Sequence, residues 1–95
     1  MNPRFEQLLA RCRQVADLSA AAAVLGWDEQ TYMPPAGARA RADQRATLSR
    51  LIHSLVASPE MGELLDRLAD DVRDLPPDSD EAALVRLARR QYDQA

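Results

Sequence analysis

Few side chains in this 95-residue sequence are suited to catalysis, and their spacing argues against a catalytic site within the chain. His53 is the only histidine and Cys12 is the only cysteine. A catalytic zinc ion usually takes three protein ligands, commonly two or three of them histidine, and neither His-Glu-x-x-His nor Cys-x-x-Cys is present. We therefore expect no metal-binding and no catalytic residue in this chain.

The remaining reactive groups favour structural roles. No serine lies in a nucleophile-elbow sequence, and the three glycines are scattered, whereas phosphate-binding loops need clustered glycines. His53 lies beside an apolar stripe and is expected to pack or to form a hydrogen bond. Cys12 in a helical pattern is expected to be a small buried apolar residue. The acids of the C-terminal half, such as Asp70, Asp71 and Asp74, are typical of a solvated helix face.

The most distinctive segment is residues 27–37, Trp-Asp-Glu-Gln-Thr-Tyr-Met-Pro-Pro-Ala-Gly. Asp28 is suited to accept backbone N–H groups in a turn, and Thr31 can return such a bond. Trp27 offers a large apolar area with a single N–H donor. Taken from the residues alone, this segment predicts a connector between two helices that is held in place by its indole ring.

Composition narrows the class of partner. The net charge of −3 argues against nucleic acid, because phosphate binding needs a basic surface. Residues 1–50 carry seven Arg and five acids, whereas residues 51–95 carry five Arg and ten acids. No apolar run approaches the roughly 20 residues of a membrane span, and charges interrupt any signal-peptide core near the start. We expect a protein of the cytoplasm with no membrane or nucleic-acid partner.

The elements that must position these residues are four helices, over residues 3–26, 37–57, 59–73 and 79–95. Asn2 and Pro3 start the first helix as cap and first residue, and Gly26 is expected to end it. The second helix begins after the Pro34-Pro35 pair, which excludes an ordinary helix at that point. The fold class is all-α, a long antiparallel helical hairpin plus two shorter helices, in one domain spanning residues 1–95.

Capping signals also define the two shorter helices. Ser58 and Pro59 begin the third helix, and Asp78 with Glu81 three residues later predicts a capping box for the fourth. Helical spacing directs one set of apolar side chains from each helix inward. These are Met61, Leu64, Leu65, Leu68 and Val72 in the third helix, and Ala82, Val85, Leu87, Ala88 and Tyr92 in the fourth. The fourth helix has no stop signal, so we expect the chain to be a fragment of a larger helical enzyme.

The segment from Leu18 to Pro35 resembles the N-terminal signature of carboxypeptidase Taq-type metallocarboxypeptidases. The pattern Trp-Asp-x-x-Thr-x-Met-Pro is matched at every fixed position by five residues. They are Trp27, Asp28, Thr31, Met33 and Pro34. Further stretches that resemble the family are residues 38–53, 58–62 and 85–93, so the resemblance covers most of the chain.

The resemblance implies a cytoplasmic, mostly helical peptidase that removes residues from peptide C-termini and is often a homodimer. It also implies zinc or cobalt held by a His-Glu-x-x-His motif and a later glutamate, in a catalytic domain that is absent from this chain. The expected role of the five matched residues is structural or in the substrate groove. We expect an N-terminal, lid-like domain that covers this groove and is inactive alone.

Two other functions remain open from the sequence. The chain is alternatively a free-standing helical interaction module without catalysis, or a small metal-binding or redox protein that uses Cys12 and His53. If the chain is a fragment, the apolar faces of the third and fourth helices would be uncovered. Such a patch favours self-association, and we expect a dimer.

Overall fold

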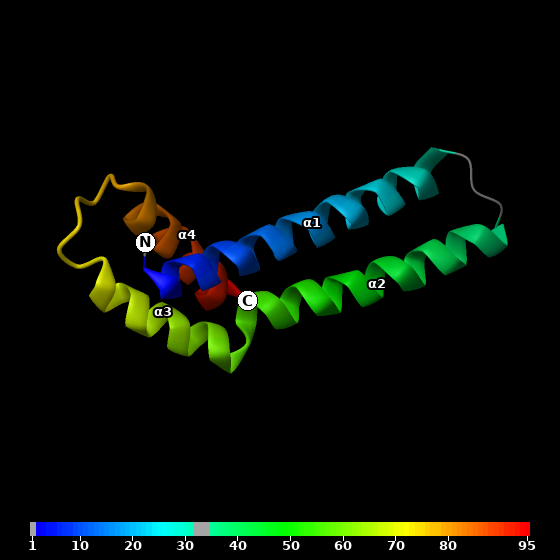
Figure 1. The fold of residues 1–95 in the computed structure, drawn as a ribbon. Coiled ribbons are helices and arrows are strands. Elements are labelled where there is room, and N and C mark those ends of the chain that lie inside the picture. Colours follow the sequence, from blue (N-terminus) through cyan, green and yellow to red (C-terminus); the bar gives the residue numbers. More distant parts are fainter. Residues whose placement is uncertain (1, 32–34) are drawn as a thin grey trace.

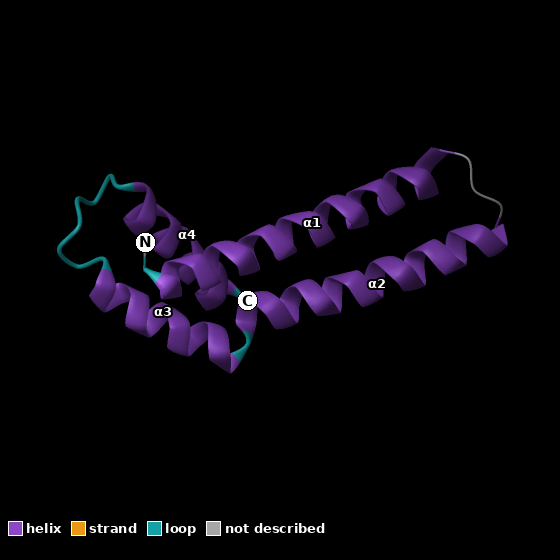
Figure 2. Cartoon of the chain, viewed as in Figure 1, coloured by secondary structure: helices purple, strands orange, loops and turns teal. Residues whose placement is uncertain are grey.

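The computed structural model describes residues 2–31 and 35–95, and all of the regular secondary structure in these ranges is helical (Figures 1 and 2). The helices are α1 (Pro3–Thr31), α2 (Pro35–Ala57), α3 (Pro59–Asp71) and α4 (Asp80–Gln94). The predicted all-α class and the long antiparallel hairpin, formed by α1 and α2, are confirmed. The molecule is elongated, with extents of 55 × 24 × 21 Å.

The molecule has two regions that differ in packing. We call the first the base: α3, α4 and the N-terminal part of α1 up to Cys12. The second, the arm, consists of the rest of α1 together with α2, and it extends away from the base in Figure 1. The buried core lies in the base and consists of Phe5, Leu8, Met61, Leu64, Leu65, Leu68, Ala82, Val85 and Ala88.

Most of the predicted inward-facing residues of α3 and α4 are in this core or contact it. Leu64, Leu65 and Leu68 are buried, and Val72 and Tyr92 pack against the cluster from its margin. Leu87 was predicted to face inward, and it lines a cavity together with Leu84 and Ala88, but it remains 47% exposed. The expectation that the apolar faces of α3 and α4 would be uncovered is wrong, because Phe5 and Leu8 of α1 pack against both helices.

The helix starts follow local capping chemistry. The Asn2 side chain accepts the backbone N–H of Arg4 at 2.8 Å, so the predicted cap of α1 is confirmed. Ser58 caps α3 and accepts the N–H of Met61 at 3.2 Å, with Pro59 as first helical residue. For α4 the predicted Asp78 cap is wrong. Ser79 is the cap instead, and its hydroxyl accepts the N–H of Ala82 at 3.2 Å.

Two predicted boundaries of the hairpin are also wrong. α1 does not end at Gly26 but continues to Thr31, and α2 begins at Pro35 instead of residue 37. Gly26 does not adopt a positive φ, so it makes no left-handed helix stop. Its missing side chain instead leaves room for α2, since a Cβ on Gly26 would lie 3.3 Å from the Arg45 guanidinium. Packing across the hairpin therefore overrides the local preference of glycine to end a helix.

Candidate functional site

The end of the arm holds the sequence-predicted site. Trp27 and Asp28 lie in the last turns of α1, which also includes Thr31, whereas Met33 and Pro34 lie outside the described residues. The helix therefore carries Trp27 and Asp28 on a regular backbone rather than in the predicted connector. The Trp27 side chain is 68% exposed, so burial of the indole does not hold the hairpin together as predicted.

Asp28 joins the two helices of the arm. Its Oδ2 accepts the Nε–H of Arg41 at 3.0 Å, across the hairpin from α2. Arg41 also donates from Nη1 to the side-chain oxygen of Gln44 at 2.9 Å. An exposed ion pair of this kind contributes at most about 1 kcal/mol, so its main effect is to fix the register of the two helices near Trp27.

No local sequence pattern predicts the Asp28–Arg41 pair, because its partners are 13 residues apart on different helices. At the base, Asn2, Arg4 and Asp71 form another polar contact between residues far apart in the sequence, which we call the Asp71 clamp. Asp71 accepts from Asn2 Nδ2 at 2.8 Å and from Arg4 Nη1 at 2.8 and 2.9 Å. These bonds lower the pKa of the Asp71 carboxyl, with the Arg4 hydrogen bond as the largest cause. Asp71 is therefore part of a structural contact between α1 and α3 and not only of a solvated face.

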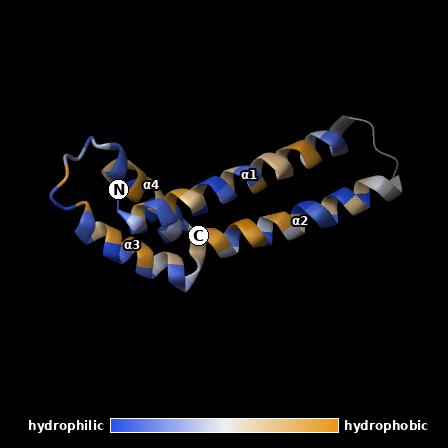
Figure 3. Cartoon of the chain, viewed as in Figure 1, coloured by the Kyte–Doolittle hydropathy of each residue, from blue (hydrophilic) through white to orange (hydrophobic). Residues whose placement is uncertain are grey.

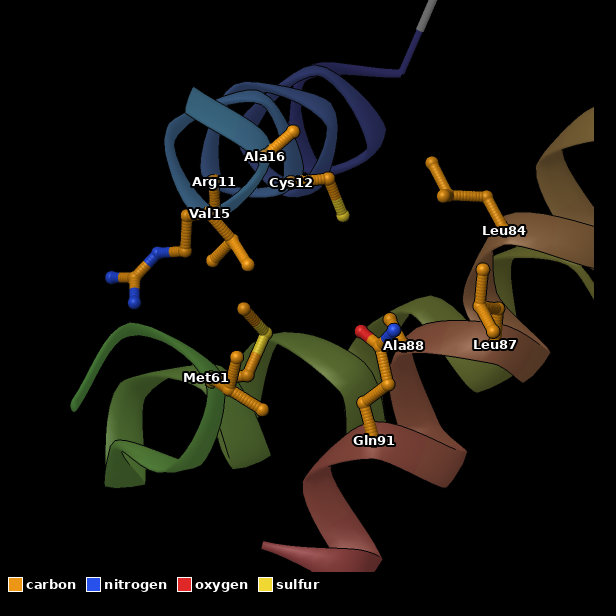
Figure 4. Close-up of a pocket in the computed structure, with 10 residues that line it drawn as sticks. Arg11, Cys12, Val15, Ala16, Met61, Leu84, Leu87, Ala88 and Gln91 are labelled. Carbon is orange, nitrogen blue, oxygen red and sulfur yellow. The ribbon is translucent and has the colours of Figure 1, made fainter. Parts of the chain in front are cut away.

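An apolar cavity of about 290 Å³ lies where the base meets the arm, and residues of all four helices line it (Figure 4). Its walls include Cys12, Val15, Met61, Leu84 and Leu87. Burial raises the pKa of the Cys12 thiol, which keeps it protonated and weakly nucleophilic, consistent with the predicted apolar role. The cavity therefore presents apolar surface and no reactive group.

Two polar side chains lie at the margin of this cavity, Arg11 and Gln91. The guanidinium of Arg11 points away from the cavity in Figure 4, and its Nη1 donates to Ser58 Oγ at 3.2 Å. Arg11 thus braces the junction between α2 and α3 and does not supply a charge to the cavity.

The described residues do not assemble a metal centre. Within residues 2–31 and 35–95 there is no group of three or more His, Cys, Asp or Glu side chains that could hold an ion. His53 was predicted to pack or to form a hydrogen bond, but the residue is exposed on α2. In the same ranges, no helix combines the length and the apolar character needed to cross a membrane.

Comparison with known proteins decides the family. The model of the carboxypeptidase Taq (M32) metallopeptidase family matches residues 7–95 of this chain. The chain belongs to this family.

Curated relatives support the assignment. Thermostable carboxypeptidase 1 of Thermus thermophilus is 35% identical over 91 residues, which is 96% of this chain and 18% of the relative. Carboxypeptidase 1 of Bacillus subtilis is 33% identical over 82 residues, 86% of this chain and 16% of the relative. Thermostable carboxypeptidase 1 of Pyrococcus furiosus is 35% identical over 66 residues, 70% of this chain and 13% of the relative. The chain thus spans less than a fifth of the length of these relatives. No solved structure matches it significantly.

Proposed function

We propose that this chain is the N-terminal helical domain of a metal-dependent carboxypeptidase, in which it covers the substrate groove. The observation that carries the proposal is the family match over residues 7–95, combined with a long arm whose described residues form no buried core of their own. The exposed Trp27 at the end of the arm supplies the apolar contact area that such a cover would use.

In this proposal the chain contributes shape and substrate positioning, not bond cleavage. A metal, zinc or cobalt, would supply the chemistry by activating water in the parent enzyme, held by residues outside this chain. The described residues of the chain do not fit such an ion, so no catalytic step passes through them. Its partners would be the remainder of the carboxypeptidase and, through it, a peptide in the cytoplasm.

The proposal is tested by exchanging the 91 matched residues of the Thermus thermophilus relative for this chain. We expect the chimera to release C-terminal residues from peptides, and this chain alone to release none with zinc or cobalt added. Trp27→Ala in the chimera is expected to raise KM about tenfold, equivalent to a loss of about 1.4 kcal/mol of binding. Val24→Ala, at a side chain exposed to a similar degree (64% against 68%), is the matched control and should change KM less than twofold.

Three outcomes would contradict the proposal. The first is a chimera that folds, as judged by helical circular dichroism, but has no peptidase activity. The second is stoichiometric metal binding with peptidase activity by this chain alone. The third is an equal effect of Trp27→Ala and Val24→Ala on KM, which would mean that Trp27 makes no specific contact in the substrate groove.

A free-standing interaction module is the second candidate, and one observation favours it. The base has a closed core of nine buried apolar residues from α1, α3 and α4, so the chain can bury apolar surface without a catalytic domain. Reading the source gene beyond codon 95 separates the two. A downstream His-Glu-x-x-His motif supports the carboxypeptidase domain, and an immediate stop codon supports the module.

Self-association of the chain is the remaining part of the proposal. The reason differs from the one expected from the sequence, because α3 and α4 are covered within the chain and the arm is not. Large exposed apolar side chains on the arm include Val24, Trp27 and Leu51. Apolar surface of this kind favours association in a protein of this size.

A further inference from the structure

The side of α1 that faces α2 is defined near the end of the arm by Leu25, Gly26 and Asp28. A Cβ on Gly26 would lie 3.3 Å from Nε and Cζ of Arg45, so the Arg45 side chain lies against α1 there. Asp28 accepts the Nε–H of Arg41 at 3.0 Å. Leu25 lines an open depression together with residues of α2. These contacts show which side of α1 is turned toward its partner helix.

Trp27 lies on the opposite side of α1. Successive residues of an α-helix are about 100° apart around its axis. Counted from Gly26, Leu25 and Asp28 are at about 260° and about 200°, so the three α2-facing residues centre near roughly 270°. Trp27 is at about 100°, roughly 170° from this centre, and it is 68% exposed. The direction in which the indole projects therefore depends on the rotation of α1 about its own axis.

Packing gives this rotation little support. Residues 37–46 of α2, which run beside the last turns of α1, contain no apolar side chain larger than alanine. Figure 3 shows the apolar residues of α2 gathered in the half nearer the base. Within residues 13–28 and 37–57 no residue is buried. An interface that removes little apolar area from water gains little from one rotation over another, so a directional polar contact has more influence here than in the base.

Asp28 is suited to a contact with α2 and not to the end of its own helix. It lies in the last turn of α1, where the helix dipole favours cations and disfavours a carboxylate. That turn has no basic residue, and Arg41 of α2 supplies a cation instead. Asp28 is therefore explained by the contact between the two helices better than by the stability of α1 alone.

Arg41 is itself held in place on α2. Its Nη1 donates to the side-chain oxygen of Gln44 at 2.9 Å, while its Nε donates to Asp28. A guanidinium is planar and its N–H donors have a fixed geometry, so a bond at Nη1 restricts the direction available to Nε. Two consecutive hydrogen bonds thus lead from Gln44 through Arg41 to the residue next to Trp27.

From these observations we infer that Arg41 is a positioning residue for Trp27. Through Asp28 it sets the rotation of α1 that turns the indole away from α2 and toward the substrate peptide. Gln44 supports this role by orienting the Arg41 guanidinium. The inference rests on the groove contact proposed above for Trp27 and adds the residues that direct it.

The first test measures kcat and KM of the chimera described above, with Arg41→Gln and Arg50→Gln as a matched pair. Both variants remove one arginine charge from α2, but Arg50 bonds to Thr47 of the same helix, at 3.1 Å. We expect Arg41→Gln to raise KM about threefold and to leave kcat unchanged, because an exposed ion pair biases the rotation of α1 by a modest amount. Arg50→Gln should change neither constant.

Dependence on Trp27 separates positioning from a general loss of structure. If Arg41 acts through the indole, Arg41→Gln should have no further effect on KM in the Trp27→Ala chimera, whereas independent effects would multiply. Arg41→Lys keeps the charge but loses the fixed donor geometry, so we expect a KM between those of the unsubstituted chimera and Arg41→Gln. The exchange Asp28→Arg/Arg41→Asp should return KM to within about twofold of the unsubstituted chimera, since it rebuilds the pair in the opposite sense.

The isolated 95-residue chain provides a second measurement, because Trp27 is its only tryptophan. Loss of the Arg41 contact lets the end of α1 rotate, so Arg41→Gln should lower the fluorescence anisotropy of Trp27. Arg50→Gln should leave the anisotropy as in the wild type, and circular dichroism should show equal helix content in all three proteins. This measurement needs neither a substrate nor a catalytic domain.

Two results would overturn the inference. One is a KM of Arg41→Gln equal to that of Arg50→Gln while Trp27→Ala still raises KM, which leaves the groove contact standing without this positioning residue. The other is an increase in KM by Arg41→Gln that persists in full in the Trp27→Ala background. If Trp27→Ala and Val24→Ala have equal effects, the proposed function fails instead, and the anisotropy of Arg41→Gln still decides whether Arg41 positions Trp27.

Discussion

The base and the arm of this molecule are built from similar lengths of helix, yet among the residues that the structure describes only those of the base form a buried core. α3 and α4 concentrate their apolar residues on one narrow face, and these faces meet around Leu8, Leu65 and Leu68, which are all fully buried. The arm distributes alanine and leucine more evenly around α1 and α2, so that every described residue of α2 keeps some exposure. The difference indicates that the base supplies most of the packing that stabilises the chain, whereas the arm leaves apolar side chains such as Val24, Trp27 and Leu51 exposed.

The largest expected effect comes from comparing leucine truncations in the two regions. Leu65→Ala in α3 should lower the free energy of unfolding by about 2–5 kcal/mol, because it leaves a cavity in the core of the base. Leu48→Ala in α2 should cost less than about 1 kcal/mol, since this side chain is half-buried and solvent can fill the space. Urea unfolding followed by circular dichroism measures both, and equal losses would contradict the division into base and arm.

A second comparison uses the same substitution at two helical glycines. A Cβ on Gly62 would lie 2.5 Å from the hydroxyl and 2.9 Å from Cζ of Tyr92, so Gly62→Ala must displace the Tyr92 ring. We expect it to destabilise the chain by about 1–3 kcal/mol. Gly26→Ala in the arm should instead be neutral or stabilise by up to about 1 kcal/mol, because Arg45 is flexible and alanine favours helix.

Thermal melts of both glycine variants provide the measurement. Tyr92→Ala in the Gly62→Ala background should recover part of the loss attributed to the clash. If Gly62→Ala changed the melting temperature as little as Gly26→Ala, Tyr92 of α4 would not pack as closely against Gly62 of α3 as described.

The junction between the two regions should respond to loss of Ser58. Its hydroxyl accepts the N–H of Met61 and the Nη1–H of Arg11, so Ser58→Ala removes a helix cap and a contact to α1 at once. We expect a loss of about 0.5–2 kcal/mol in the free energy of unfolding. Ser54→Ala is the control, because its hydroxyl bonds only to the Arg50 carbonyl within α2 at 3.0 Å, and it should change stability little.

The smallest effect concerns pH and the clamp at the N-terminus of α1. The hydrogen bonds from Arg4 and Asn2 lower the pKa of Asp71, so the ionised carboxylate is favoured in the folded chain. This stabilisation is fully present above the unfolded aspartate pKa of about 3.9 and is lost as the pH falls through the lower folded value. Melting temperature measured down this acid range should fall, and Asp71→Asn should show a weaker fall. If the melting temperatures of the wild type and Asp71→Asn fell identically with pH, the ionised Asp71 would not stabilise the contact between α1 and α3.

The sequence alone determined the helical class, all four helix starts within two residues, and most of the core. Capping residues such as Ser58 and the apolar spacing of α3 act over three or four residues, so they can be recognised locally. It also identified the family through the motif that begins at Trp27, and the family model confirms this membership.

Tertiary structure decided what depends on residues distant in the chain. The continuation of α1 past Gly26, the Asp28–Arg41 pair and the Asp71 clamp each require the position of a second helix. The cap of α4 moved from Asp78 to Ser79, a choice between neighbouring residues that the turn before the helix decides. The exposure of Leu51 and the cover over α3 and α4 follow from which helices meet, and local periodicity carries no information on that choice.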